Sequence, residues 1–429
     1  MISRDQAKQI LDDWQQTYIA YLDELKPRSP QIKPSKHYAH GLVGVRRCGK
    51  SWAAIELAAS IATAQRSPQV RRSLYLNFED PAFMGNDSYQ NIDVLLSVDA
   101  EFEKTPITTL ILDEIQNIQG WERWVRKAVD SKQTNIMITG SSAKLLSSEL
   151  ATSLTGRCLE HRIWPLSYKE FLNFTNRRLT TYEQHRGALS EYLQWGGFPA
   201  VVLENETRIK KELLKQYALD IVSKDVVARN AIRDRRALDQ MTRYYATNIS
   251  SLHSYQAIRK AFDITVDMAV DYTRYLNDAF YCFEVQRFHP NMKVQIRDPK
   301  KIYGIDTGLR NVLTQSVNQD RGKLVENVVF IELMRRGYDV NYYRGERECD
   351  FVLTENGSPH TVIQVTDSNL EEASLKEREI RGLLEAAKAT KLKSGVIVTD
   401  RLHETRSIEN VKIQFIPLHM WLTSDSAET

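Results

Sequence analysis

The sequence of 429 residues has few cysteines and no long apolar run. Its four cysteines, at positions 48, 158, 282 and 349, form neither a CxxC pair nor a group with histidines. This spacing argues against a disulfide framework and a common zinc module, and it suits a reducing compartment. No stretch approaches the ~18 consecutive apolar residues of a membrane span, and the first residues do not resemble a signal peptide. We therefore expect a cytoplasmic protein with no membrane partner.

A strong excess of charge is also missing. The net charge of +3 is the small difference between 58 basic and 55 acidic residues, so only a local basic patch can argue for a nucleic acid. Hydrophobic residues make up 42% and charged residues 26% of the chain, which is typical of globular proteins. The length predicts several domains.

Strands and helices are expected to alternate in the first 165 residues. Helical spacing of apolar residues over 4–25 is followed by a linker with three prolines. Strands are then predicted at 38–45, 73–78, 108–112 and 135–139, with 159–163 as a candidate fifth, and helices at 50–64 and 121–130. The run at 108–112 is continuously apolar, as in a strand buried on both faces. This alternation is typical of an α/β domain with a doubly wound parallel sheet.

A phosphate-binding motif lies between the first of these strands and its helix. Gly44 and Gly49 fit the fixed glycines of the pattern, and Lys50 and Ser51 complete it. The glycines allow the backbone to approach phosphates, Lys50 offers a charge to the β- and γ-phosphates, and Ser51 offers a hydroxyl to Mg²⁺. The predicted nucleotide-binding residues are Gly44, Val45, Arg46, Arg47, Cys48, Gly49, Lys50, Ser51 and Trp52. Two arginines are unusual inside such a loop, and their role is open.

Two carboxylates end the strand at 108–112. Asp113 is placed to hold Mg²⁺, and Glu114 to polarise the attacking water. Two acidic residues at a strand end are common by themselves, but with the phosphate loop about 60 residues earlier they predict an ATPase that uses Mg²⁺.

Two further catalytic candidates are open to other interpretations. After the next strand, Ser141 or Ser142 is a candidate to contact the γ-phosphate or its water, although two serines there also suit a helix cap. Arg157 is a candidate arginine finger, and a structural ion pair explains it equally well.

Together with other stretches, these motifs resemble a known family. The chain is similar to prokaryotic ATP-binding proteins that join an AAA-group ATPase domain to a C-terminal domain of unknown function 4143. The matching stretches are 44–51, 77–81, 112–121, 139–146, 165–171, 196–199, 300–308 and 348–351. The resemblance covers nearly the whole chain and implies ATP binding and hydrolysis. AAA-group relatives include rings and single-chain switches, so a homo-oligomer is one expectation and the oligomeric state stays open.

Residues 166–236 are expected to form a helical linker, and residues 237–312 a winged-helix module. Three helical segments followed by two strand-like runs is the element order of a winged helix. We expect the helix at 266–276 to enter a DNA major groove and a basic ribbon to contact phosphates. The ribbon residues are Arg287, Lys293, Arg297, Lys300 and Lys301. The alternative is a module that packs on other domains with solvated charges.

The last segment, 320–429, resembles the restriction-endonuclease-like fold. The resemblance places Glu326, Asp350 and Gln364 at the positions of Mg²⁺ ligands. Thr366 stands where a lysine is expected, with Lys323 as a candidate substitute, so we expect an inactive scaffold of nuclease shape.

The sequence thus predicts an Mg²⁺-dependent ATPase that couples its nucleotide state to DNA through the winged-helix and nuclease-like domains. One alternative is a nucleotide-gated signalling switch with a protein partner. Another is an ATP-dependent DNA nuclease.

Overall fold

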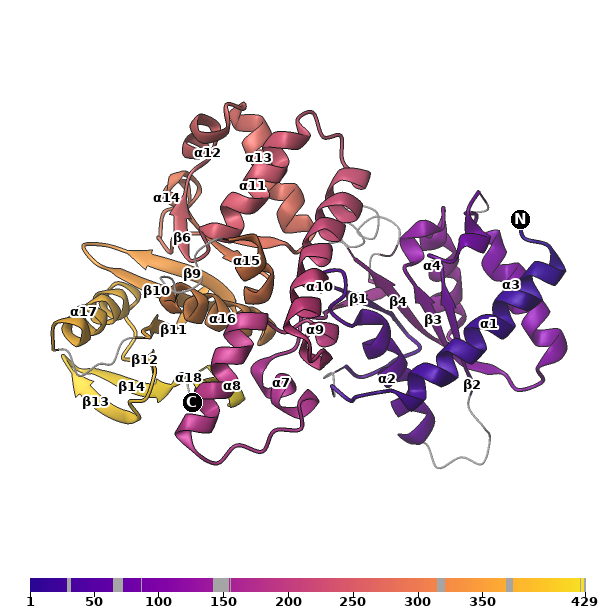
Figure 1. Ribbon diagram of the computed structural model, residues 1–429, viewed down its shortest axis with the longest axis horizontal. Coiled ribbons are helices and arrows are strands. Elements are labelled where there is room, and N and C mark those ends of the chain that lie inside the picture. The colour runs from indigo at the N-terminus through magenta and orange to yellow at the C-terminus, as the bar shows by residue number, and fades with distance from the viewer. Residues whose placement is uncertain are drawn as a thin grey trace. The chain divides into compact units, whose positions relative to one another are not determined.

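The structure, a computed structural model, describes residues 1–28, 32–64, 72–85, 87–141, 154, 156–314, 321–367, 373–424 and 426–427 (Figure 1). The chain divides into two compact units, Met1–Trp164 and Pro165–Thr429. None of the helices in the described residues has the length and apolar character needed to cross a membrane.

Five parallel strands form the sheet of the N-terminal unit. They are β1 (Ala39–Val43), β2 (Arg72–Asn77), β3 (Ile107–Asp113), β4 (Asn135–Gly140) and β5 (Cys158–Arg162), in the order β2-β3-β4-β1-β5. Every residue of β1 and β4 is buried, as expected for strands with both faces covered. The predicted α/β class with a parallel sheet is confirmed.

Four α-helices accompany this sheet in the described residues. They are α1 (Arg4–Asp23), α2 (Lys50–Ala64), α3 (Gln90–Phe102) and α4 (Trp121–Ser131). Helix α3, which packs against α1, is absent from the sequence predictions. Its N-cap residue, Tyr89, makes no side-chain capping bond, so the usual start signal of Ser, Thr, Asp or Asn is missing there.

The C-terminal unit begins with a helical segment. Its helices are α7 (Tyr168–Phe174), α8 (Tyr182–Trp195), α9 (Pro199–Leu203) and α10 (Thr207–Asp220). Between α8 and α9 the Gly197 amide donates to Asp306 at 2.7 Å. A Cβ on Gly196, whose φ is 73°, would lie 2.0 Å from a carboxylate oxygen of Asp306, so the turn requires glycine. The motifs at 196–199 and 300–308 therefore meet in space.

Next comes a module of helices around a small antiparallel sheet. The helices are α11 (Arg235–Thr247), α12 (Tyr255–Phe262), α13 (Val266–Asp278), α14 (Met292–Arg297) and α15 (Thr307–Leu313), and the strands are β6 (Ser251–His253), β7 (Cys282–Val285) and β8 (Lys300–Gly304). The sheet order is β6-β8-β7. The three predicted helices and two strands are present in the predicted order, together with strand β6 and helix α14, which were not predicted.

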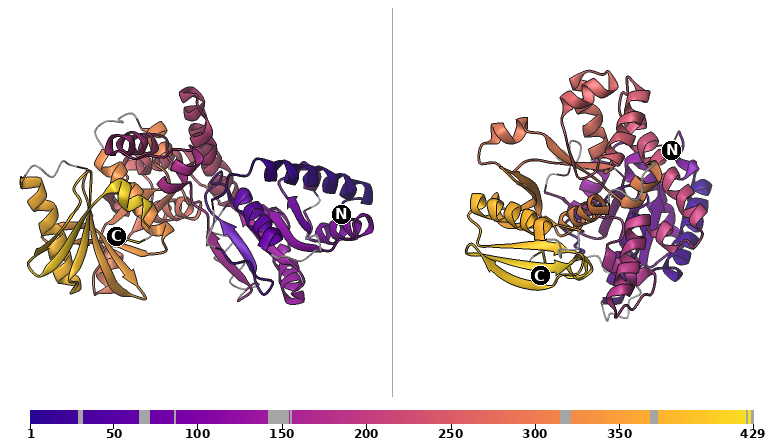
Figure 2. Two further views of the ribbon diagram at one scale, coloured as in Figure 1. Left: turned by 90° about the horizontal axis from the view of Figure 1, so that it is seen from below. Right: turned by 60° about the vertical axis from the view of Figure 1, so that its left-hand side comes forward.

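A mixed sheet of six strands forms the last part of the chain. The strands of this sheet are β9 (Asp339–Arg344), β10 (Glu348–Glu355), β11 (Ser358–Val365), β12 (Ser394–Thr399), β13 (Glu404–Ile408) and β14 (Val411–Pro417). The helices of this part of the chain are α16 (Arg321–Arg335), α17 (Ala373–Thr390) and α18 (Leu418–Thr423). The strand order is β13-β14-β12-β11-β10-β9. Helix α17 lies along one face, against β10, β11 and β12 (Figure 2).

A histidine pair joins β1 to β5. His40 Nε2 accepts the Ser35 amide at 3.0 Å, so the ring proton lies on Nδ1, which is 3.0 Å from His161 Nε2. Both rings are therefore neutral. Burial, assisted by the neighbouring His161, lowers the pKa of His40 to about 4, and burial also lowers the pKa of His161.

Acid should destabilise the N-terminal unit through this pair. Because the folded pKa of His40 is depressed, the unfolded state binds more protons, and stability present above about pH 6.5 is lost as the pH falls toward 4. Melting temperatures from pH 7.5 to 4.5 should fall more steeply for the wild type than for His40→Gln/His161→Gln. Equal slopes would contradict the assignment.

Candidate functional site

The phosphate loop connects β1 to α2 and is fixed against the end of β5. The Ile163 amide donates to Val43 at 2.7 Å, and the Cys48 thiol donates to the Ile163 carbonyl at 3.0 Å. A Cβ on Gly44 would lie 2.0 Å from that same carbonyl oxygen, so this close approach requires glycine. Gly49 has a φ of 98°, which also favours glycine.

Lys50 opens helix α2 and turns its amine back onto the loop. Its Nζ donates to the carbonyls of Gly44 and Val45 at 3.3 Å each, and the side chain is buried. Among the described residues, no carboxylate forms an ion pair with the Lys50 ammonium group. A buried cation beside a helix N-terminus is suited to an anionic ligand such as a phosphate.

Both oxygens of Asp113 are held by hydroxyl groups from neighbouring strands. Thr139, near the end of β4, donates to Oδ1, and Tyr75 of β2 donates to Oδ2 at 2.6 Å. Asp113 is buried and closes β3, next to β4 in the sheet. These bonds orient the carboxylate that the sequence assigned to Mg²⁺. With the Ser51 hydroxyl it makes a set of hard oxygen donors, which fits Mg²⁺.

Glu114 is held in an unusual backbone conformation immediately after β3. Its φ of 52° is left-handed, which is uncommon for a residue with a side chain and is found at functional sites. The Glu114 amide donates to the Thr139 hydroxyl at 3.1 Å, and Gln116 donates to its carboxylate. Burial raises the pKa of Glu114.

Arg46 links the loop to two other strand ends. This buried side chain donates to Glu79, after β2, at 2.8 Å and to the Ser141 hydroxyl, after β4, at 3.5 Å. Ser141 is thus near the loop through Arg46, whereas Ser142 lies outside the described residues. Arg47, the other loop arginine, is exposed and has a φ of 71°.

Arg157 lies at the end of the parallel strands opposite to the end that carries the phosphate loop. It precedes β5, whose first residue pairs in parallel with Ala39 at the start of β1, and its Nε donates to Asp130 at 2.8 Å. The phosphate loop follows the other end of β1, about 16 Å away for five residues. Arg157 is therefore in an ion pair and does not reach the loop of its own subunit. A finger for a neighbouring subunit stays a prediction.

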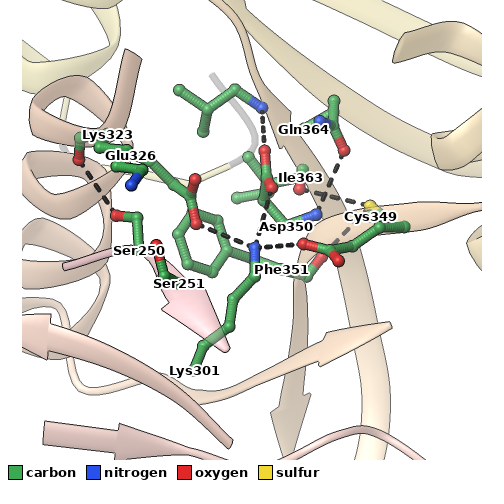
Figure 3. Close-up of polar contacts among 12 residues, drawn as sticks. Ser250, Ser251, Lys301, Lys323, Glu326, Cys349, Asp350, Phe351, Ile363 and Gln364 are labelled. Carbon is green, nitrogen blue, oxygen red and sulfur yellow. Dashed lines mark hydrogen bonds and ion pairs between the residues drawn. The ribbon is translucent and has the colours of Figure 1, made fainter. Parts of the chain in front are cut away.

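A second cluster of acidic residues lies in the C-terminal unit, around Lys301. The Lys301 amine lies 3.0 Å from Glu326, 2.7 Å from Glu348 and 3.2 Å from Asp350, and its side chain is only 3% exposed (Figure 3). Burial works to lower the pKa of Lys301, yet Tyr303 and the surrounding carboxylates raise it well above its ordinary value. A lysine therefore stands among the residues predicted to hold Mg²⁺.

Asp350 and Gln364 make further hydrogen bonds within this cluster. Asp350 Oδ2 accepts the Val365 amide at 3.0 Å, and Gln364 spans the Asp350 amide and Glu379. Within the part of the chain that the structure describes, no three or more His, Cys, Asp or Glu side chains could together hold a metal ion. The predicted metal set of Glu326, Asp350 and Gln364 does not fit Mg²⁺ here. The lysine that reaches it is Lys301, not the predicted Lys323.

Comparison with known proteins defines the family. Family models match an AAA domain at 36–172, a domain of unknown function 8612 at 186–320 and a domain of unknown function 4143 at 321–421. The uncharacterized protein MJ1544 of Methanocaldococcus jannaschii is 33% identical over 92% of this chain and 90% of its own length. The chain belongs to this family of AAA-domain proteins with a C-terminal domain of unknown function 4143. An uncharacterized protein of Haemophilus influenzae is 32% identical over 72% of this chain and 78% of its own.

Solved structures match the AAA-domain protein only loosely. AMPPCP-bound DnaA from Aquifex aeolicus has 14% identity and a TM-score of 0.26, covering 61% of this chain and 87% of that chain. Drosophila ORC bound to DNA has 10% identity and a TM-score of 0.23, covering 70% and 94%. Likenesses at this level carry no argument about function.

The five basic residues predicted to contact DNA do not form a ribbon in the AAA-domain protein. Lys301 is buried, Arg287 pairs with Asp298 at 2.6 Å, and Lys300 lies 3.6 Å from Glu284. Lys293 and Arg297 are exposed on the short helix α14, between β7 and β8. The predicted ribbon is therefore wrong as a continuous surface, because one lysine faces inward and two residues belong to a helix.

Residues that sequence reasoning missed are Tyr75, Glu79, Thr139 and Glu348. Each lies in a strand, or just after one, and contacts a residue that is distant in sequence. Thr139 opens the motif at 139–146, and its position near the end of β4 was the available signal. The contact between Tyr75 and Asp113 depends on the register of β2 with β3, which the sequence does not reveal.

Proposed function

We propose that this chain is an Mg²⁺-dependent ATPase whose nucleotide state acts on the C-terminal unit. The observation that carries the proposal is the buried Lys50 amine at the start of α2, together with Asp113 at the end of β3 and Glu114 directly after it. Strand β4 lies between β1 and β3, and its Thr139 contacts both acidic residues. The ends of three adjacent strands thus bring a cation and two carboxylates into one domain.

Each group has a role in hydrolysis. The loop amides and Lys50 bind and orient the phosphates. Ser51 and Asp113 would hold Mg²⁺, which would neutralise charge on the phosphates. Glu114 accepts a proton from water as the water oxygen bonds to the γ-phosphorus. The bond to the leaving oxygen breaks, its electron pair stays on ADP, and the products are ADP, phosphate and a proton.

Steady-state assay of phosphate tests this reaction. The chain should release phosphate from ATP in Mg²⁺ and none in EDTA. Nucleotide binding without any phosphate release would instead support a nucleotide-held switch with a protein partner.

A DNA partner is the second part of the proposal, and it rests on α14. We propose that the module from α11 to β8 is a winged helix and that the connection between β7 and β8 is its wing. Lys293 and Arg297 are exposed there, which suits phosphate contacts. Helix α13, expected to enter the major groove, instead exposes Asp267 and pairs Arg274 with Asp271. DNA contact is therefore assigned to the wing.

Charge reversal on α14 tests the DNA contact. Lys293→Glu/Arg297→Glu should weaken binding of duplex DNA and reduce the slope of log affinity against log salt by about 2. The control is Arg126→Glu/Lys127→Glu on α4, which makes the same change in net charge at exposed positions. If both variants bind DNA like the wild type, the wing does not contact DNA.

A further inference from the structure

Tyr75 lies at the meeting point of helix α1 and the Asp113 carboxylate. Its side chain is buried, 1% exposed, and its hydroxyl donates to Asp113 Oδ2 at 2.6 Å. Strands β2 and β3 run parallel, with Tyr75 opposite Ile111 and Asn77 opposite Asp113. Tyr75 and Asn77 are two residues apart on β2, so both side chains lie on the same face of the sheet. The register of the sheet therefore aims the tyrosine at the carboxylate.

The Tyr75 ring is enclosed by three aromatic side chains of α1. Its centroid lies 5.5 Å from that of Trp14, 6.3 Å from Tyr18 and 6.1 Å from Tyr21. The spacing of four and three residues places all three on one face of the helix. The Trp14 indole also donates to Asp80, after β2, at 2.9 Å. One face of α1 is thus packed around the residue that bonds to Asp113.

Helix α1 also contacts the start of α2, where Ser51, the other predicted Mg²⁺ ligand, lies. The Tyr21 ring lies 4.8 Å from that of Trp52, the residue directly after Ser51. Helix α1 therefore touches a neighbour of Ser51 through Tyr21 and the partner of Asp113 through Tyr75. The rings of α1 therefore lie against the immediate neighbours of both predicted ligands.

We propose that Tyr75 is a positioning residue that sets the Asp113 carboxylate for Mg²⁺–nucleotide and couples it to the aromatic face of α1. This inference rests on the proposed ATP site. A hydroxyl donor behind a metal-binding carboxylate fixes its orientation, and the loss of such a donor typically lowers metal affinity. Thr139 donates to Oδ1 of this carboxylate and Tyr75 donates to Oδ2. Removing the tyrosine hydroxyl leaves only the first of these two bonds, so the orientation of the carboxylate is less fixed.

Tyr75→Phe tests the hydroxyl and keeps the ring. Binding of a non-hydrolysable ATP analogue, followed by calorimetry, should need about 10-fold more Mg²⁺ for half-saturation than in the wild type. Affinity for the analogue in EDTA and the melting temperature without nucleotide should stay near the wild-type values. The matched control is Tyr18→Phe, which removes a hydroxyl from another ring of the same cluster and should leave the Mg²⁺ dependence unchanged.

Trp14 gives an independent readout in a chain that keeps Tyr75. The emission of Trp14 is obtained as the fluorescence of the wild type minus that of Trp14→Phe. This emission should change when the analogue and Mg²⁺ are added together. An unchanged Mg²⁺ requirement in Tyr75→Phe, or a silent Trp14, overturns the inference while the ATP site stands. If the wild type binds no analogue at all, the proposed ATP site fails as well.

Discussion

Replacing Glu114 by Gln should lower the rate of ATP hydrolysis about 100-fold or more, because the amide cannot accept the proton of the attacking water. The backbone of Glu114 is held by Thr139 in a left-handed conformation, and its carboxylate accepts a bond from Gln116. The substitution preserves size and the possibility of hydrogen bonding. Binding of ATP should therefore persist, because the phosphates are held by the loop and Lys50.

The measurement is phosphate release under saturating ATP, with binding followed separately by calorimetry. Glu103→Gln is the matched control, since this exposed carboxylate follows α3 and its loss should leave the rate unchanged. If Glu114→Gln hydrolyses ATP at the wild-type rate, another group accepts the proton and the assignment of Glu114 is wrong.

Removing the charge of Lys301 should have the largest effect on stability. Lys301→Met leaves Glu326, Glu348 and Asp350 together without the cation between them. Breaking a buried ion pair by deleting one partner costs about 3–5 kcal/mol. We therefore expect the C-terminal unit to unfold at a much lower urea concentration, or to fail to fold.

The control for this variant is Lys293→Met, the same change at an exposed position, which should alter the free energy of unfolding by no more than about 0.5 kcal/mol. Equal stability of the two variants would show that the carboxylates do not depend on Lys301. The inactive nuclease-like scaffold that the sequence predicts has its own test. Mg²⁺-dependent cleavage of DNA by the wild type, lost in Asp350→Ala, would contradict that prediction.

Many regular elements followed from local patterns, but α3, β6, β13, β14 and α18 were not predicted. The strands of the N-terminal sheet were located within about two residues, and β3 and β4 were the easiest because strands buried on both faces have little other sequence freedom. The phosphate loop was readable because its residues are contiguous. Helix α14 was missed since it has only six residues and lies in a connection between two strands.

The contacts between distant residues did not follow from the sequence. Lys301 lies in a strand flanked by basic residues, so it reads as part of a charged surface. Its burial depends on residues of α16 and β10, and these are 25 to 49 positions away. Likewise, the sequence places Tyr75 in a buried strand but does not show that its hydroxyl reaches Asp113. That contact depends on the register of β2 with β3. Charge and burial at such positions are decided by tertiary packing.

The most direct test of the ATP site is a calorimetric titration of ATP with Mg²⁺ into the wild type and Lys50→Ala, followed by assay of phosphate in the same samples. We expect the wild type to bind ATP and release phosphate. Lys50→Ala should bind about 10-fold more weakly or worse, because a charge-assisted contact to the phosphates is lost. No binding by the wild type, or equal binding by the two proteins, would contradict the assignment of this loop as the ATP site.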